Sequence, residues 1–313
     1  MLKIILNEKF RNLYKKLIFF YYNNKNLILR RVLFSKISII TKNIEKLFCF
    51  HLKRRKGSKK KILIIIGNPR CGSTLIYQFL VRVIDCEYFS NLHQLLPRSA
   101  SYLLLYFNSF LKLEDKINNL YGHTKNLSDT NEANEMVNFW FKTSKIKEIR
   151  KRFYETMEYF NYDRTNLLII KNISLYDKIY NLHKAVPEIL FLHISRNKRA
   201  VVESVVKSHN DLGYFNFPPK ELKCIGPNLI DHSVNYIQSI EKTILYQLNK
   251  INDQNIIYFS YEKFCKNPYD LIKILKHKIS FALKNKNLKL KVRQSNRKKV
   301  SREEKVQIKK ILK

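Results

Sequence analysis

The most informative part of the sequence is Ile62-Leu-Ile-Ile-Ile66, followed by Gly67-Asn-Pro-Arg-Cys-Gly-Ser-Thr74. Five consecutive apolar residues, most of them β-branched, are typical of a strand buried on both faces of a parallel sheet. The glycine-containing segment after them predicts a turn. From Ser73 to Ile84 the apolar residues recur on one stripe, which predicts a helix. Strand, turn and helix together form a βα unit.

The rest of the chain repeats this alternation. Strands are predicted at Leu167–Ile170, Ile189–Ile194 and Ile256–Phe259, and helices from Leu175 to about Ala185, from Lys198 to about His209, from Leu229 to Ile251 and after Pro268. Alternating strands and helices predict an α/β domain with a mostly parallel central sheet flanked by helices. Ligands of such sheets bind beyond the carboxyl ends of the strands. The polar residues at the predicted strand ends, Gly67–Gly72, Lys171 and Arg196, are therefore expected to line one site.

The segment from Gly67 to Thr74 resembles the G-x-x-x-x-G turn of a P-loop. Its glycines let backbone N–H groups surround an anion, and the start of the following helix adds a positive dipole end. The lysine that follows the second glycine in nucleotide-hydrolysing P-loops is missing here, and no strand ends in a magnesium-binding Asp. Arg70 supplies the cation instead, and Ser73 and Thr74 add hydroxyl donors.

A second phosphate-binding pattern begins where the strand at Ile189–Ile194 ends. Arg196 leaves that strand, and Ser204 follows eight residues later, about two turns into the next helix. The two side chains can reach one phosphate from two sides, with the guanidinium binding in a bidentate manner. Alone, an arginine at a strand end is better explained by a surface ion pair.

Together these segments resemble the sulfotransferases that use 3′-phosphoadenylyl sulfate (PAPS). This resemblance implies a P-loop-like sulfotransferase fold. Gly67–Thr74 is similar to their G-x-P-[RK]-[ST]-G-[ST]-[ST] loop, and Arg196–Ser204 to their R-[DN]-P-[RK]-x-x-[VA]-x-S segment. Leu168–Asn172 and Tyr261–Pro268 resemble two further segments of the family. The likeness extends from about Lys61 to Ser280 and is nearest to prokaryotic and carbohydrate-type members.

The resemblance implies in-line transfer of a sulfuryl group from PAPS, as co-substrate and without a metal, to an acceptor hydroxyl or amine. It implies that Arg70, Cys71, Gly72, Ser73, Thr74, Arg196, Ser204 and Tyr261 bind the nucleotide, with Arg70 also stabilising the leaving phosphate. The family places a Glu or His beyond the first helix as general base. Two candidates stand there. His93 is expected just past an edge strand, and Glu135 lies in a segment that resembles an acceptor-side helix, with Phe139 and Trp140 as apolar contacts of the acceptor.

Two positions depart from the family pattern. Cys71 stands where Ser is usual, and beside Arg70 and a helix N-terminus we expect its thiolate to be favoured. A tolerated replacement explains this cysteine better than a redox role. Asn197-Lys198 replaces an Asp-Pro or Asn-Pro pair, so a proline that fixes the turn is lost but no ligand is lost.

The charge of the chain is concentrated at its ends. The 313 residues include 60 basic and 25 acidic side chains, a net charge of +35. Residues 1–61 carry +16, residues 284–313 carry +11, and the middle carries only +8. Such ends suit an anionic membrane surface or a polyanion, although a genome biased toward Lys, Asn and Ile would give the same charge. We expect a basic helical extension (1–57), a sulfotransferase-like domain (58–285) and a basic C-terminal segment (286–313).

Composition excludes several classes of protein. With 45% hydrophobic residues the chain is not disordered, and its longest uncharged stretch, Ser99–Leu111, is too short to span a membrane. The five scattered cysteines suggest no disulfide framework or zinc site, and no signal peptide is evident. We expect a cytoplasmic protein, with peripheral contact to the inner membrane face through its basic N-terminal segment.

The acceptor is open at this level. A loop from Asp211 to Asn228, with Tyr214, Phe215 and Phe217, is predicted to cover the site, and a glycan or glycolipid acceptor suits the chain. Two alternatives remain: a P-loop-type kinase or NTPase, and a non-enzymatic basic module that binds membrane or, less well supported, nucleic acid.

Overall fold

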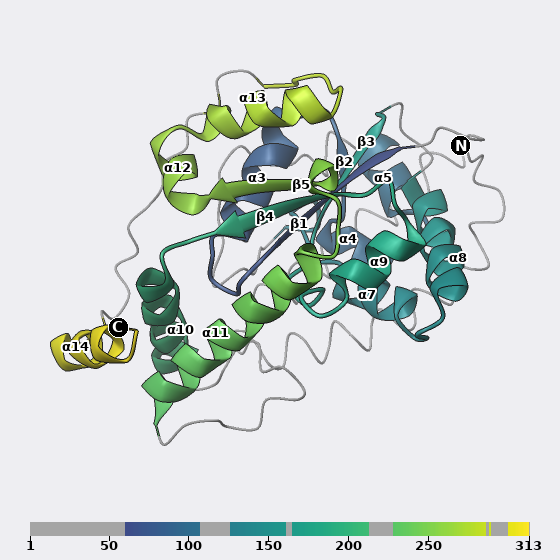
Figure 1. The fold of residues 1–313 in the computed structure, drawn as a ribbon. Helices are drawn as coiled ribbons and strands as arrows, with labels where there is room; N and C mark the ends of the chain where they lie inside the picture. Colours follow the sequence, from purple (N-terminus) through teal and green to yellow (C-terminus); the bar gives the residue numbers. More distant parts are fainter. Residues whose placement is uncertain are drawn as a thin grey trace.

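Five parallel strands form one sheet in the order β2-β3-β1-β4-β5 (Figure 1). The computed structural model describes residues 60–106, 126–160, 165–212, 228–285, 288 and 300–312. The strands are β1 (Lys61–Gly67), β2 (Glu87–Tyr88), β3 (Leu167–Lys171), β4 (Leu190–Ser195) and β5 (Ile256–Ser260). The first strand in the sequence therefore lies at the centre of the sheet, between β3 and β4.

Helices connect the strands and cover the sheet. They are α3 (Ser73–Val83), α4 (Asn91–Leu95), α5 (Ala100–Tyr106), α7 (Asn134–Trp140), α8 (Ile146–Met157), α9 (Ile179–Ala185), α10 (Lys198–Leu212), α11 (Leu229–Leu248), α12 (Tyr261–Lys266), α13 (Pro268–Lys278) and α14 (Arg302–Ile311). Two short 3₁₀ turns, η2 (Glu158–Phe160) and η3 (Asp253–Asn255), complete the described elements.

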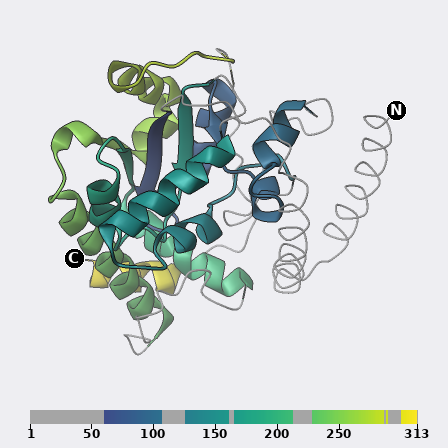
Figure 2. The same cartoon turned by 90° about the vertical axis from the view of Figure 1, so that its right-hand side faces the viewer.

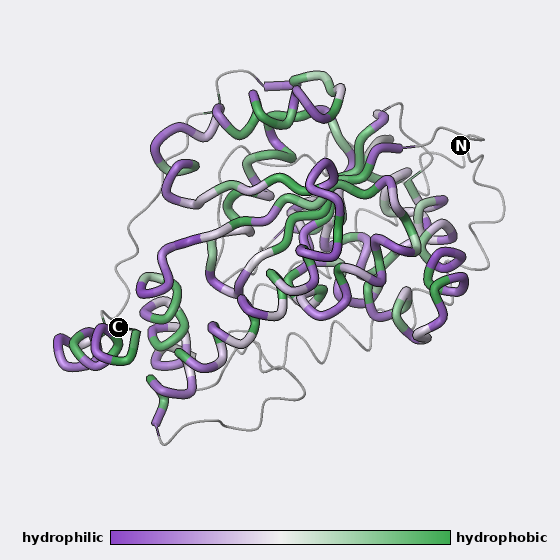
Figure 3. Tube along the Cα trace, in the orientation of Figure 1, coloured by the Kyte–Doolittle hydropathy of each residue, from purple (hydrophilic) through white to green (hydrophobic). Residues whose placement is uncertain are grey.

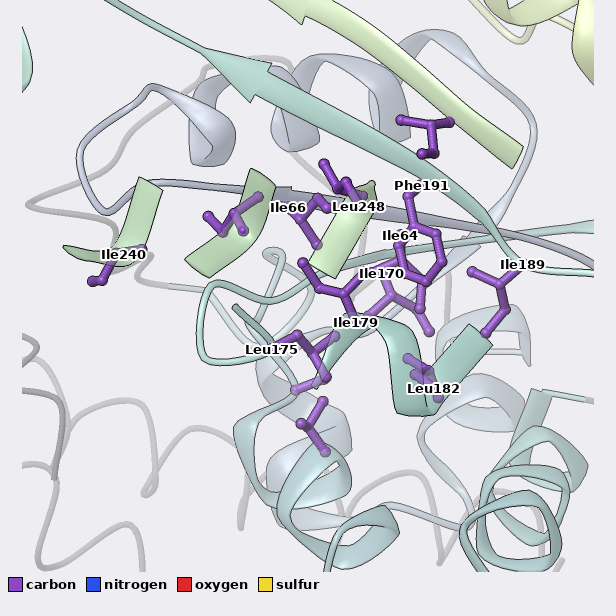
Figure 4. Packing of buried hydrophobic residues seen from close by; sticks show 14 of the residues in the cluster. Ile64, Ile66, Ile170, Leu175, Ile179, Leu182, Ile189, Phe191, Ile240 and Leu248 are labelled. Atoms are coloured by element: carbon purple, nitrogen blue, oxygen red, sulfur yellow. The ribbon is translucent and has the colours of Figure 1, made fainter. Parts of the chain in front are cut away.

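Each face of the sheet has its own apolar core. On one face, α3, α12 and α13 pack against side chains such as Leu63 and Ile65. On the other face, side chains such as Ile64 and Ile66 belong to a core with residues of α7 to α11. Figure 4 shows them with Ile179 and Leu182 of α9 and with Ile240 and Leu248 of α11. Figure 2 shows the helices on both sides of the strands, and Figure 3 shows the hydrophobic strands at the centre with hydrophilic residues toward the periphery. Burial on both faces explains why these strands are continuous apolar runs.

The structure confirms the α/β fold and four predicted strands, which are β1, β3, β4 and β5. One helix begins later than predicted: α9 starts at Ile179 and not at Leu175. The amide of Lys178 donates to the carbonyl of Leu175, which closes a turn, and the Ser174 hydroxyl donates to the side chain of Asn172. These local bonds compete with the helix, as serine and asparagine side chains commonly do.

The two basic ends differ in what the structure describes. The predicted helical extension over residues 1–57 lies outside the described residues. Residues 213–227 of the predicted covering loop also lie outside them. In the C-terminal segment, α14 packs against α10 and α11, and Ile308 is fully buried there. The domain boundaries themselves stay predictions. No helix in the described ranges is long and apolar enough to cross a membrane.

Candidate active site

The loop between β1 and α3 has a backbone that only small residues permit at two positions. Gly72 has a φ of 92°, and a Cβ there would lie 2.2 Å from the Tyr261 ring. At Gly67 a Cβ would lie 2.6 Å from the carbonyl oxygen of Ile194. Arg70, between them, has a φ of 68°, which is uncommon for a residue with a side chain. Such strain is often found at functional sites.

The N-terminus of α3 follows this loop directly and is suited to an anion. Its N-cap is Gly72, no side chain caps the helix, and its first turn holds no acidic residue. The first N–H groups of a helix lack partners within the helix, and they carry the positive end of its dipole. Ser73 is buried and Thr74 is half-buried at this end.

Arg70, Ser204 and Arg196 meet beside the loop. The Nε of Arg70 donates to the Ser204 hydroxyl at 3.1 Å, across 134 residues of sequence. The Nη1 of Arg196 donates to the carbonyl oxygen of Arg70 at 2.9 Å. The two segments predicted to bind opposite ends of one nucleotide are therefore in direct contact, at the carboxyl ends of β1 and β4.

Tyr261 forms the floor under this cluster. It begins α12 after β5, and the guanidinium carbon of Arg196 lies 4.6 Å from the centre of its ring. Burial of the ring raises the pKa of the Tyr261 hydroxyl to about 12, so the phenol is protonated at neutral pH. The ring also touches Gly72, and it thereby connects the loop to the arginine. This stack is a cation–π contact, which restrains the guanidinium plane.

Cys71 differs from its expected chemistry. Its side chain is 1% exposed, and burial raises the pKa of the thiol, although Ser73, Lys171 and Arg196 act in the opposite direction. The expectation of a favoured thiolate is therefore wrong, because desolvation outweighs the nearby charges. Cys71 is a small buried group that fills the space under the loop.

Lys171 joins the loop to the segment that carries Glu132. It ends β3, only 2% of it is exposed, and its charge acts on the Cys71 thiol. Its ammonium group forms an ion pair with the Oε1 of Glu132. The exits of β1 and β3 thus share one polar site, as the parallel sheet predicts.

The backbone around Glu132 is held in an unusual turn. Ala133, the next residue, has a φ of 55°, and it and Arg70 are the two non-glycine residues with positive φ in the described ranges. The Asn131 side chain accepts from the Ala133 amide at 2.9 Å, and the Asn172 side chain donates to the Glu132 carbonyl at 2.7 Å. Glu132 is therefore fixed by its neighbours on both sides.

One carboxylate oxygen of Glu132 has no hydrogen-bond partner although it is buried. Lys171 occupies Oε1, and Oε2 remains without one. Buried polar atoms are rarely left unpaired. A carboxylate oxygen in this state is suited to accept a proton or a hydrogen bond from a bound acceptor.

His93 has the environment of a structural residue. It is 2% exposed, its Nδ1 bonds Ser90, and its Nε2 bonds the Ser101 hydroxyl at 3.0 Å. Its ring stacks on Phe160, and burial lowers the pKa of His93 to about 3. Both nitrogens have protein partners within the core, so these contacts do not support the expected role as general base.

Glu135 stays a prediction. It is exposed, in the first turn of α7 and three residues beyond Glu132. Its neighbour Trp140, expected to contact an acceptor, is fully buried and donates through its indole nitrogen to Thr156. Trp140 therefore belongs to the core and not to an acceptor surface.

Sequence reasoning missed Glu132, although it stands in the same segment as Glu135. Its partner Lys171 lies 39 residues away, a distance that no local pattern reveals. The available signal was the pair of asparagines, Asn131 and Asn134, which favours a turn rather than a helix at Glu132. Among the residues that the structure describes, no three His, Cys, Asp or Glu side chains gather into a group that could hold a metal ion.

Comparison with solved structures finds the same fold in a bacterial sulfotransferase. STF1 from Mycobacterium tuberculosis H37Rv superimposes with a TM-score of 0.54 at 11% identity, over 85% of this chain and 82% of that one. STF9 from Mycobacterium avium gives a TM-score of 0.48 at 12% identity, over 71% of this chain and 64% of that one. This chain therefore spans less than two thirds of STF9. No curated protein sequence matches.

The comparison with family models covers the same region as the sheet and the site. Residues 63–277 match the model described as "Sulfotransferase family", which is more than half of the 313 residues. The match includes the loop after β1, the exits of β3 and β4 and the start of α12. The chain belongs to the sulfotransferase family.

Proposed function

We propose that this protein transfers a sulfuryl group from PAPS to a hydroxyl or amine of an acceptor, with a carbohydrate or glycolipid as the expected acceptor class. The observation that carries the proposal is the meeting of Arg70, Ser204, Arg196 and Tyr261 beside an uncapped helix N-terminus. These are the residues that the family resemblance assigns to the nucleotide, and they come from three different strand exits.

The residues fit a nucleotide with two anionic ends. The amides at the start of α3, with Ser73 and Thr74, are suited to the 5′-phosphosulfate. Arg196 and Ser204 are suited to the 3′-phosphate. Arg196 forms no ion pair with a carboxylate within the described ranges, so its charge is available to an anion. Arg70 lies between the two groups and can contact either end.

We assign Glu132 as the general base for a hydroxyl acceptor. Its free Oε2 would take the proton of the acceptor hydroxyl as the acceptor oxygen bonds to sulfur. The bond between sulfur and the bridging phosphate oxygen breaks at the same time, and the nucleotide leaves as a 3′,5′-bisphosphate. This assignment replaces His93, whose nitrogens are occupied, and leaves Glu135 as the alternative.

Lys171 can serve both halves of the reaction. Its ammonium group neutralises Glu132 in the resting site and lies near enough to the loop to act on Cys71. As Glu132 takes up a proton, the charge of Lys171 is released toward the negative charge that develops on the transferred group. Fixed charges of this kind stabilise a transition state without reorganisation.

The surroundings of Glu132 support an acceptor rich in hydroxyl groups. Amide and hydroxyl side chains form two hydrogen-bonded groups next to Glu132. Asn131 bonds Asn91 and Gln94 of α4, and Asn172 and Ser174, after β3, bond Asn134 at the start of α7. Such groups both donate and accept hydrogen bonds. The proposal includes a cytoplasmic location, and peripheral membrane contact is supported only by the charge of residues 1–61.

Calorimetric titration of the protein with adenosine 3′,5′-bisphosphate tests the proposal, with ATP–Mg as comparator. We expect metal-independent, micromolar binding of the bisphosphate, and its loss in both Arg70→Ala and Arg196→Ala. Preference for ATP–Mg would contradict the proposal and favour a kinase or NTPase. No binding of either nucleotide would favour a non-enzymatic basic module.

A further inference from the structure

Strands β4 and β5 continue their register beyond the end of the sheet. Ser195 and Ser260 are the last paired residues of the two strands, whose arrowheads lie side by side in Figure 1. One residue further, Arg196 stacks on the ring of Tyr261. Two residues further, the backbone N–H of Asn197 donates to the Glu262 carboxylate at 3.0 Å. Two side-chain contacts thus extend the ladder after its backbone bonds end.

Asn197 joins the arginine to the helix that carries the serine. Its side chain accepts from the Ala200 amide at 3.1 Å, which caps the N-terminus of α10. The backbone N–H of Asn197 donates to Glu262. Any rotation of the backbone at Asn197 would therefore move Arg196 and Ser204 relative to each other.

Glu262 supplies a restraint that the sequence of the turn lacks. A proline at position 198, as in the family pattern, would fix the backbone just after Asn197. This chain has Lys198 there, and the carboxylate of Glu262 holds the turn from a different strand exit. The restraint comes from outside the turn, and it acts on the residue next to Arg196.

We propose that Glu262 is a positioning residue that sets the selectivity of the site for nucleotides with a 3′-phosphate. It does so by accepting a hydrogen bond from the backbone N–H of Asn197. This bond fixes the backbone at Asn197 and therefore the position of the Arg196 side chain relative to that of Ser204. This inference rests on the proposed function, because it assumes that these two side chains bind the 3′-phosphate. Glu262 itself is exposed and acts only through its neighbours.

The sign of the effect separates positioning from plain electrostatics. Glu262 is an anion near a site for anions, so removing its charge alone should strengthen the binding of a phosphate. If the carboxylate positions the turn, its removal should weaken that binding. Glu262→Gln removes the charge but keeps an oxygen that can accept from Asn197, whereas Glu262→Ala removes both.

The experiment is a calorimetric comparison of two nucleotides on three proteins. Adenosine 3′,5′-bisphosphate and adenosine 5′-monophosphate are titrated into the wild type, Glu262→Ala and Glu262→Gln. For Glu262→Ala we expect about threefold to tenfold weaker binding of the bisphosphate, the range of one hydrogen bond, and unchanged binding of the monophosphate. For Glu262→Gln we expect bisphosphate binding equal to or tighter than that of the wild type.

Bisphosphate binding that is unchanged or tighter in Glu262→Ala would overturn the inference. An equal loss for both nucleotides would also overturn it, because the effect would then be general. A wild type that does not prefer the bisphosphate would instead contradict the proposed function. Thermal unfolding of each variant verifies that the fold is intact, which we expect because Glu262 is exposed.

A rescue variant gives a second, independent readout. Lys198 is the first residue of α10, a helix position that accepts proline well. In the Glu262→Ala background, Lys198→Pro should restore bisphosphate binding, because the proline ring fixes the turn that the carboxylate no longer holds. Absence of rescue, with the fold intact, would contradict the positioning role.

Discussion

Replacing Gly72 with alanine should force the loop and Tyr261 apart. The added Cβ would lie 2.2 Å from Cδ2 and 2.3 Å from Cε2 of the ring. Ordinary van der Waals contact begins near 3.4 Å, so the ring or the loop must move by more than 1 Å. The φ of 92° adds strain, because alanine rarely adopts that conformation. We expect a loss of about 2 to 4 kcal/mol in the free energy of unfolding.

The same displacement should also disturb the nucleotide site. Tyr261 supports the guanidinium of Arg196 at 4.6 Å, so a displaced ring leaves Arg196 without its stacking partner. We expect Gly72→Ala to weaken binding of adenosine 3′,5′-bisphosphate by at least tenfold. Urea unfolding measures the stability change and calorimetric titration measures the affinity.

A double-mutant cycle tests the steric explanation. Tyr261→Ala removes the ring atoms that the new Cβ would meet. The destabilising effect of Tyr261→Ala should therefore be smaller in the Gly72→Ala background than in the wild type, by about 1 to 2 kcal/mol. Gly67→Ala is the matched control, because its Cβ would meet the backbone oxygen of Ile194 at 2.6 Å and Tyr261→Ala cannot relieve that contact. Strictly additive effects of Gly72→Ala and Tyr261→Ala would contradict the steric explanation.

Three further predictions concern titratable side chains in the site and in the neighbouring core. Glu132→Gln should abolish sulfuryl transfer while nucleotide binding is kept, and Glu135→Gln should leave both intact. Single-turnover assays with a donor labelled in its sulfate group measure the transfer. The reverse pattern would assign the general base to Glu135 and not to Glu132. Cys71 should resist thiol reagents at pH 8, because burial raises its pKa, whereas exposed Cys265 should react; mass spectrometry of the labelled protein shows which residue is modified. His93 has a pKa lowered to about 3, so the unfolded chain binds a proton that the folded protein refuses, and its contribution to stability falls as the pH drops from about 6.5 toward 3. Between pH 7 and pH 5 this loss should be about 2 kcal/mol, and a chemical-denaturation series at several pH values should show a flatter profile for His93→Gln.

The strands of this fold could be predicted because their environment is uniform. β1, β3 and β4 are covered on both faces, and such strands are runs of apolar residues that stand out in any sequence. The edge strand β2 has only two residues, so the sequence placed an edge strand before His93 without giving its bounds. Helix α8 was not predicted, although its buried residues Ile149, Phe153 and Thr156 recur at helical spacing. The late start of α9 depends on hydrogen bonds between Asn172, Ser174 and Asn134, which come from separate segments.

The site divides along a similar line. Arg70, Arg196, Ser204 and Tyr261 were predictable because each stands at a fixed offset from a strand end, and the parallel sheet brings such ends together. Glu132 was not singled out, because its placement depends on an ion pair with the distant Lys171 and on a turn in which Ala133 has a positive φ. For Cys71 the sign of the pKa shift depended on burial, which local sequence does not show.

The strand order has a consequence for how fast this protein acquires its native state. The central strand β1 pairs with β3 and β4, which follow it by roughly a hundred residues or more, and the Arg70–Ser204 bond closes a loop of 134 residues. Contacts between such distant residues are slow to form, because the entropy of closing the loop is lost before the contact is gained. The cluster of Arg70, Ser204, Arg196 and Tyr261 therefore cannot assemble until the start of α12 has left the ribosome. Nascent chains that stop before β5 would expose apolar strands without ever having formed this cluster.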